Sequence, residues 1–130
     1  MMALGSGSAC RGQLTKGIIL LVCLILSQHE TIQAATHVVG GRHGWTFNVA
    51  DWPTGKTFYA GDVLVFKYSP LFHNVVAVDS DGYNNCTVSS DAKELKSGKD
   101  RITLSNGTSY FICSRFDHCT LGMKIAVTAV

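Results

Sequence analysis

Three side chains that commonly bind soft metal ions lie close together near the end of the chain. Cys113, His118 and Met123 occur at intervals of five in the run Cys-Ser-Arg-Phe-Asp-His-Cys-Thr-Leu-Gly-Met. Sulfur ligands favour copper(I), imidazole suits both copper oxidation states, and two His with one Cys and a weakly bound Met form a blue-copper electron-transfer site. The second imidazole must come from elsewhere, and His73 is the best candidate. The spacing therefore predicts a small protein that carries single electrons on one type 1 copper ion.

The first residues of the chain have the pattern of a secretory leader. Arg11 and Lys16 precede the apolar run Ile18–Leu26, and a polar stretch then leads to Ala34 and Ala35. A basic start, a short apolar core and small residues at the exit are typical of a cleaved signal peptide. The apolar run has nine residues, whereas a helix needs about 20 to span a bilayer. We therefore expect no retained membrane anchor.

The leader is predicted to cover residues 1–34, which leaves one domain of residues 35–130; cleavage one residue later fits the pattern nearly as well.

The predicted mature chain has a nearly balanced charge. The sequence has 11 Lys and Arg and 9 Asp and Glu; two of the basic and one of the acidic residues fall in the leader, so nine basic and eight acidic side chains remain. This balance does not favour nucleic acid as a partner. The run Lys124–Val130 alternates like a strand, unlike the hydrophobic tail of a glycolipid-anchored protein. A soluble, secreted monomer is expected.

The cysteine count predicts one disulfide and one metal-bound thiolate. Of the five cysteines, Cys10 and Cys23 fall in the leader, and Cys86, Cys113 and Cys119 remain. An odd number in an oxidising compartment leaves one thiol to be explained. Because Cys113 has the ligand spacing, we pair Cys86 with Cys119. The alternative is a Cys113–Cys119 disulfide with Cys86 free, which leaves His118 and Met123 with no shared purpose.

Two sequons are candidate N-glycosylation sites in a secreted chain. They are Asn85-Cys-Thr and Asn106-Gly-Thr. Asn106-Gly107 also has the composition of a tight hairpin turn, so Asn106 is expected to be exposed. Asn85 adjoins a disulfide cysteine, which can block the transfer of a glycan.

Short strands separated by turn residues predict an all-β domain. Such strands at regular spacing are typical of a sandwich or barrel. The expected strands are 36–39, 62–68, 74–78, 101–104, 109–113 and 124–130. Only Ser90–Leu95 has a helical pattern, with a serine as the cap. In this layout Cys113 ends one strand, Met123 opens the next, and the loop between them presents His118.

The chain resembles the phytocyanins, plant members of the cupredoxin group, and within them the plantacyanin or basic blue subgroup. The similarity covers nearly the whole predicted mature chain. It is carried by Val38-Val-Gly-Gly41, Gly44-Trp-Thr-Phe47, Trp52-Pro53, Ala60-Gly-Asp62, His73-Asn-Val-Val76, Ser109-Tyr-Phe-Ile-Cys113 and Gly122-Met-Lys-Ile-Ala-Val127. The resemblance implies a Greek-key β-sandwich. It also implies a protein located in the extracellular space or cell wall, or held peripherally at the plasma membrane.

The resemblance also implies the roles of individual residues. The copper ligands would be His73, Cys113, His118 and Met123. The disulfide would join Cys86 to Cys119, and Asn74 would tie the two ligand loops together. An axial Met at position 123 separates the chain from stellacyanins, which have Gln there, and the full ligand set separates it from early nodulin-like relatives that lack the ligands.

One segment departs from the family pattern. Members usually have a Phe-Pro-Gly-like run before the second His, whereas this chain has Arg115-Phe116-Asp117. The loop loses a proline that fixes φ and a glycine that adopts positive φ freely. It gains a carboxylate beside His118. We expect copper binding to survive, and we hypothesise that Asp117 stabilises Cu(II) and lowers the reduction potential.

Apolar residues near the predicted ligands suggest a docking face for an unknown redox partner close to His118. They are Leu71, Phe72, Phe116 and Leu121. An apolar collar there would exclude water from the site. His37 and His43 have no place in the ligand pattern and are interpreted as surface residues.

The leading functional prediction is an electron carrier and not an enzyme, because four protein donors leave no open coordination position for a substrate. The alternative is an extracellular signalling or interaction protein of the plant cell wall, in which copper redox turnover is secondary. A structural zinc site built from Cys86, Cys113, His118 and Cys119 fits poorly, because a Cys-x5-Cys spacing is not that of structural zinc sites and secretion favours a disulfide.

Overall fold

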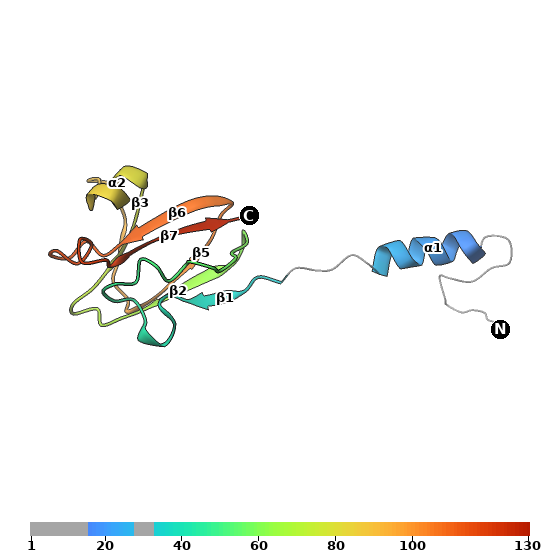
Figure 1. Cartoon of the computed structure of the whole chain (residues 1–130), viewed down its shortest axis with the longest axis horizontal. Helices are drawn as coiled ribbons and strands as arrows, with labels where there is room; N and C mark the ends of the chain where they lie inside the picture. The colour runs from blue at the N-terminus through green and yellow to red at the C-terminus, as the bar shows by residue number, and fades with distance from the viewer. Residues whose placement is uncertain (1–15, 28–32) are drawn as a thin grey trace. The chain divides into compact units, whose positions relative to one another are not determined.

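The computed structural model describes residues 16–27 and 33–130, which fall into two separate units (Figure 1). The first unit contains one helix, α1 (Lys16–Ser27). No helix in these described ranges combines the length and the hydropathy needed to cross a membrane. Most of the predicted leader, including Cys10, lies outside the described residues, so its cleavage stays a prediction.

The second unit, Ala34–Val130, consists of two β-sheets. One sheet has the order β1-β2-β5 and is formed by β1 (Thr36–Val38), β2 (Val63–Lys67) and β5 (Lys99–Thr103). The other has the order β4-β3-β6-β7 and is formed by β4 (Glu94–Leu95), β3 (Val75–Val78), β6 (Gly107–Ile112) and β7 (Lys124–Ala129). Strand β1 pairs with β2 in parallel, and every other strand pair is antiparallel. The predicted two-sheet β-sandwich of the cupredoxin type is confirmed.

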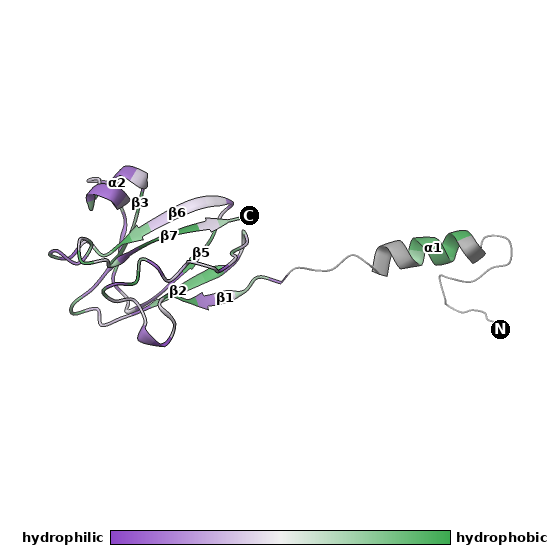
Figure 2. Cartoon of the chain, in the orientation of Figure 1, coloured by the Kyte–Doolittle hydropathy of each residue, from purple (hydrophilic) through white to green (hydrophobic). Residues whose placement is uncertain are grey.

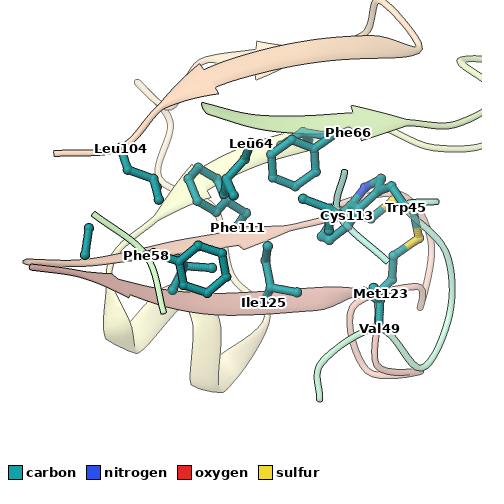
Figure 3. Close-up of a cluster of buried hydrophobic side chains, with 14 residues drawn as sticks. Trp45, Val49, Phe58, Leu64, Phe66, Leu104, Phe111, Cys113, Met123 and Ile125 are labelled. Atoms are coloured by element: carbon teal, nitrogen blue, oxygen red, sulfur yellow. The ribbon is translucent and has the colours of Figure 1, made fainter. Parts of the chain in front are cut away.

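The hydrophobic core lies between the sheets and extends to the site residues. Strand β2 has the sequence Val-Leu-Val-Phe-Lys, rich in residues that fit a pleated, half-buried surface, and it is coloured as hydrophobic over most of its length in Figure 2. Phe66 contacts both Trp45 and Phe111 edge to face, with ring centroids 5.0 and 5.3 Å apart. Cys113 and Met123 belong to the same buried cluster (Figure 3). Two predicted ligands are therefore part of the core itself.

The single short α-helix of this unit is not where the sequence pattern placed it. The helix is α2 (Ser80–Asn85), whereas the predicted helical stretch 90–95 contains a turn and strand β4. Asp79 caps α2 by accepting a hydrogen bond from the Gly82 amide at 2.7 Å, which satisfies a free backbone donor. Glu94 instead extends the β3 sheet, where it pairs with Val76. The cap at Asp79 and the pairing of Glu94 with Val76 determine where the helix forms. Neither follows from local helix propensity.

The disulfide joins the end of α2 to the loop between β6 and β7. Cys86 and Cys119 are bonded, with their Cα atoms 5.7 Å apart, so the predicted pairing is confirmed. Cys113 is free and fully buried. Both the alternative Cys113–Cys119 bond and the four-residue zinc site are thereby ruled out.

Candidate metal centre

The predicted ligands come from two loops at one end of the sandwich. His73 lies in the loop between β2 and β3. Cys113 directly follows β6, and Met123 directly precedes β7. The Cys113 amide donates to the Met123 carbonyl at 3.0 Å, so the β6–β7 ladder continues to the base of the loop. His118 stands on this closed loop, and its position is therefore set by the two strands.

Three of the predicted donor atoms converge on one point. The Nδ1 atoms of His73 and His118 are 3.2 Å apart, and the Cys113 Sγ atom is 3.5 Å from His118 Nδ1. All three donors lie within 4.8 Å of one another. Donors that each sit about 2.0–2.3 Å from one ion at near-tetrahedral angles are roughly 3.3–3.7 Å apart. The two separations that involve His118 Nδ1 lie close to this range, and the donor types suit a thiolate-binding metal ion.

Met123 belongs to the same end of the core. Its side chain is fully buried, and Figure 3 shows it beside Cys113 and Trp45. The Met123 amide also donates to the His118 carbonyl at 3.0 Å, which links it to a second predicted ligand. A buried thioether next to a buried thiol adds a soft donor to the imidazole pair.

The side chain of Asn74 connects the two loops that carry the predicted ligands. It is buried, and its side-chain carbonyl accepts from the Ser114 amide at 2.8 Å, while its amide donates to the Ser114 hydroxyl at 2.8 Å. The same amide donates to the Glu94 carboxylate at 2.5 Å. Since Asn74 follows His73 and Ser114 follows Cys113, these hydrogen bonds fix the distance between two predicted metal ligands, His73 and Cys113.

Sequence reasoning missed several residues around the ligands. The Trp45 indole donates to the backbone carbonyl of Asn74 at 2.8 Å, and Glu94 and Ser114 complete the hydrogen bonds of the Asn74 side chain. Phe47 contacts the His118 and His73 rings edge to face, with centroids 4.8 and 5.6 Å apart. Trp45 and Phe47 stand in the family-like run Gly44–Phe47, which could have pointed to them. Glu94 carried no such signal.

The loop that departs from the family pattern is held by backbone hydrogen bonds. The His118 amide donates to the Arg115 carbonyl at 3.0 Å, and the Leu121 amide donates to the Asp117 carbonyl at 3.1 Å. Phe116 takes a left-handed backbone conformation, with φ of 49°, which is costly for a bulky residue. A positive φ is therefore present in this loop without glycine at that position.

Burial and charge both act on the imidazole of His73. Desolvation is the largest influence, and the nearby His118 and Arg115 add to it, so the pKa of His73 lies below its ordinary value of 6.5. A lowered pKa keeps the ring neutral near pH 7, and a neutral ring is the form that binds a metal ion. The electrostatics and the geometry of the site point to the same chemistry.

Comparison with known proteins agrees with this geometry. Residues 45–123 match the family of plastocyanin-like domains. The chain is 54% identical to the basic blue protein of Arabidopsis thaliana over 129 residues, which cover 99% of this chain and 100% of that one. It is also 54% identical to chemocyanin of Lilium longiflorum, covering 98% and 99% of the two chains. The chain belongs to the phytocyanin family.

Solved structures support the same assignment. Cucumber basic protein, a blue copper protein, superimposes with a TM-score of 0.73 at 53% identity and covers 74% of this chain and 100% of its own. Spinach plantacyanin gives a TM-score of 0.62, also at 53% identity, over 67% and 94% of the two chains. With the converging imidazole and thiolate donors, this phytocyanin is a type 1 copper protein that binds one copper ion and carries single electrons.

Proposed function

We propose that four side chains hold the copper ion and that electrons enter and leave through His118. The proposed ligands are His73, Cys113, His118 and Met123. The observation that carries the proposal is the convergence of the Cys113 thiol and two imidazoles within 4.8 Å. The bound ion supplies a reversible one-electron couple. The protein supplies a donor set fixed by the core, and four protein donors leave no open position for a substrate, so the role is electron transfer and not catalysis.

The surface around His118 supports docking of a redox partner at this end of the molecule. His118 is half-buried, and the Phe116 ring, which is 87% exposed, lies 5.7 Å from its ring centroid. Further exposed apolar side chains near the two histidines are Phe47, Leu71, Phe72 and Leu121. A group of exposed apolar residues of this kind marks an interaction surface. The partner would meet the protein where the path to the metal is shortest.

Asp117 is proposed to tune the reduction potential of the site. Its side chain is exposed, next to His118 in sequence. At an assumed separation of about 7 Å, one negative charge would be worth roughly 0.6 kcal/mol in water and roughly 2.4 kcal/mol at an effective dielectric constant of 20, and exposure favours the smaller figure. Asp117→Asn should therefore raise the potential by roughly 25–50 mV. An unchanged potential in voltammetry at low salt would remove this role.

The setting proposed for this carrier is the plant extracellular space or cell wall. The leader-like start predicts export, and the disulfide fits an oxidising compartment. Both candidate glycosylation sites, Asn85 and Asn106, are exposed. The proposed secreted form is a monomer.

The test is a visible absorption spectrum of the 35–130 protein after addition of Cu(II). We expect an intense blue thiolate-to-copper band that is lost in Cys113→Ser. Ser114→Ala is the neighbouring control, and it should keep the band because Ser114 supplies no proposed donor. A colourless wild-type protein would contradict the ligand assignment and leave the cell-wall interaction role as the better explanation.

A further inference from the structure

A buried carboxylate lies on the side of the sandwich where the predicted mature chain begins. Asp62 is only 1% exposed, and its side chain accepts three hydrogen bonds. The donors are the backbone nitrogen of Ala35 at 2.9 Å, the His37 Nε2 atom at 3.0 Å and the Tyr59 amide at 3.0 Å. One donor is thus the residue that follows the predicted cleavage point.

We propose that Asp62 is a binding site for the new α-ammonium group that cleavage between Ala34 and Ala35 creates. This inference rests on the proposed secretion of the chain with loss of its leader. Hydrolysis of the Ala34–Ala35 peptide bond consumes one water and leaves a carboxylate on Ala34 and an amine on Ala35, which is protonated at neutral pH. The atom that already contacts Asp62 then carries a full positive charge.

The charge balance of the site favours this role. A buried carboxylate is costly unless it is paired and hydrogen-bonded, and in residues 33–130 the ion pair formed by Asp62 is with His37 alone. Burial is the largest single influence on Asp62, and it raises the pKa of the carboxyl group. The hydrogen bonds from Ala35, His37 and Tyr59 act in the opposite direction, and the pKa of Asp62 lies below its ordinary value. Before cleavage Ala35 offers a neutral amide, whereas afterwards it offers a cation. A charge-assisted hydrogen bond is roughly twice as strong as a neutral one.

The backbone register selects Ala35 over the rival start at Thr36. The Val63 amide donates to the Ala35 carbonyl at 2.9 Å, so Ala35 is held from both sides, by Asp62 and by the start of β2. Thr36 pairs with Val63 in the parallel β1–β2 ladder, and its nitrogen lies one residue, about 3.3 Å, further along the strand. Cleavage after Ala35 would remove the nitrogen that contacts Asp62.

The length of a relative agrees with this start. The cucumber basic blue protein aligns over its entire length with 96 residues of this chain, the same number as in residues 35–130. Chain ends that are not tied down tend to fray, and β1 has only three residues. An ammonium bound by Asp62 would hold β1 in place and withhold the amino group from aminopeptidases, which must bind it.

The first experiment tests processing. The full chain is secreted from a eukaryotic host, and the intact mass and the N-terminal sequence of the product are determined. We expect a product that begins at Ala35. A product that keeps its leader would overturn the proposed secretion, whereas removal of the leader with a start at Thr36 would leave secretion standing and overturn the binding site.

The second experiment tests the ion pair on protein produced to begin at Ala35. The rate at which an N-hydroxysuccinimide ester acylates the α-amine at about pH 7 is measured by mass spectrometry in wild type and in Asp62→Asn. We expect acylation about tenfold slower in wild type, the effect of raising the pKa of the amine by about one unit. The exposed substitution Asp51→Asn is the matched control and should leave the rate unchanged.

A chain that begins one residue earlier, at Ala34, keeps the test informative if Asp62→Asn fails to fold. Its α-amine lies one residue before the nitrogen that contacts Asp62. It should therefore react about tenfold faster than the α-amine of the Ala35 chain, although both chains contain the Asp62 carboxylate. Equal acylation rates for the two starts, or for wild type and a folded Asp62→Asn protein, would refute the binding site.

Discussion

Replacing Asn74 with alanine should destabilise the metal-free protein strongly, although Asn74 is not a proposed ligand. The change removes three side-chain hydrogen bonds, two with Ser114 and one to the Glu94 carboxylate. A neutral hydrogen bond contributes about 1 kcal/mol and one to a charged group about 1.5–3 kcal/mol. Alanine also leaves the Ser114 amide without its partner. Because the three bonds share one side chain, we expect a loss of about 3 kcal/mol in unfolding free energy.

The assay is urea unfolding of the metal-free protein, followed by thermal unfolding. For a domain of this size 1 kcal/mol moves the melting temperature by about 4–8 °C, so Asn74→Ala should melt roughly 12–24 °C lower than wild type. Asn84→Ala is the matched control, since Asn84 is an exposed residue of α2. It should change the unfolding free energy by less than about 0.5 kcal/mol.

A second substitution separates loss of hydrogen bonds from loss of packing. Asn74→Asp keeps the shape and can still accept from the Ser114 amide, but it places a carboxylate oxygen against Glu94. It should therefore destabilise the protein although the side-chain volume is unchanged, because two like charges in contact repel each other. If Asn74→Ala and Asn84→Ala had the same free energy of unfolding, the hydrogen bonds between the ligand loops would not contribute to stability.

Three further predictions concern the disulfide, the loop and pH. Replacing both Cys86 and Cys119 with alanine should cost roughly 3.7 kcal/mol in urea unfolding, because the bond spans 33 residues. Phe116→Gly should leave stability unchanged or raise it by up to about 1 kcal/mol in the same assay, because glycine accepts the positive φ, whereas a cost of several kcal/mol would show that the ring packs. Because the folded-state pKa of His73 lies below 6.5, the unfolded chain binds more protons as the pH falls, so metal-free protein should lose stability below about pH 6.5, and His73→Gln should lose less.

Much of the site was predictable because three of its four predicted ligands lie close together in the sequence. Cys113, His118 and Met123 lie on one loop, and a short loop between paired strands has few ways to place its ends. The pairing of Cys86 with Cys119 followed once Cys113 was assigned to the metal. His73 was harder, since only folding brings it to the loop, and family similarity supplied what spacing alone left open.

The parts that could not be predicted depend on long-range contacts. The short helix was expected at 90–95 and lies at Ser80–Asn85, because Asp79 provides a cap and Glu94 is drawn into the sheet by β3. Phe47 contacts both imidazoles from a distant loop. Propensity reports on neighbours in sequence, whereas these outcomes depend on partners that only the finished sandwich provides.

The altered loop shows how the site tolerates the loss of a proline and a glycine. The placement of the donors does not rest on the 115–117 backbone alone, because the Cys113 amide is hydrogen-bonded to Met123, the Met123 amide is hydrogen-bonded to His118, and a disulfide joins Cys119 to Cys86. Because these links do not use the predicted donor atoms, they should limit the rearrangement that accompanies a change in oxidation state. Substitutions at 115–117 are thereby free to alter the exposed surface and the local charge. The departure from the family pattern should therefore change the potential and the partner while leaving the copper ligands in place.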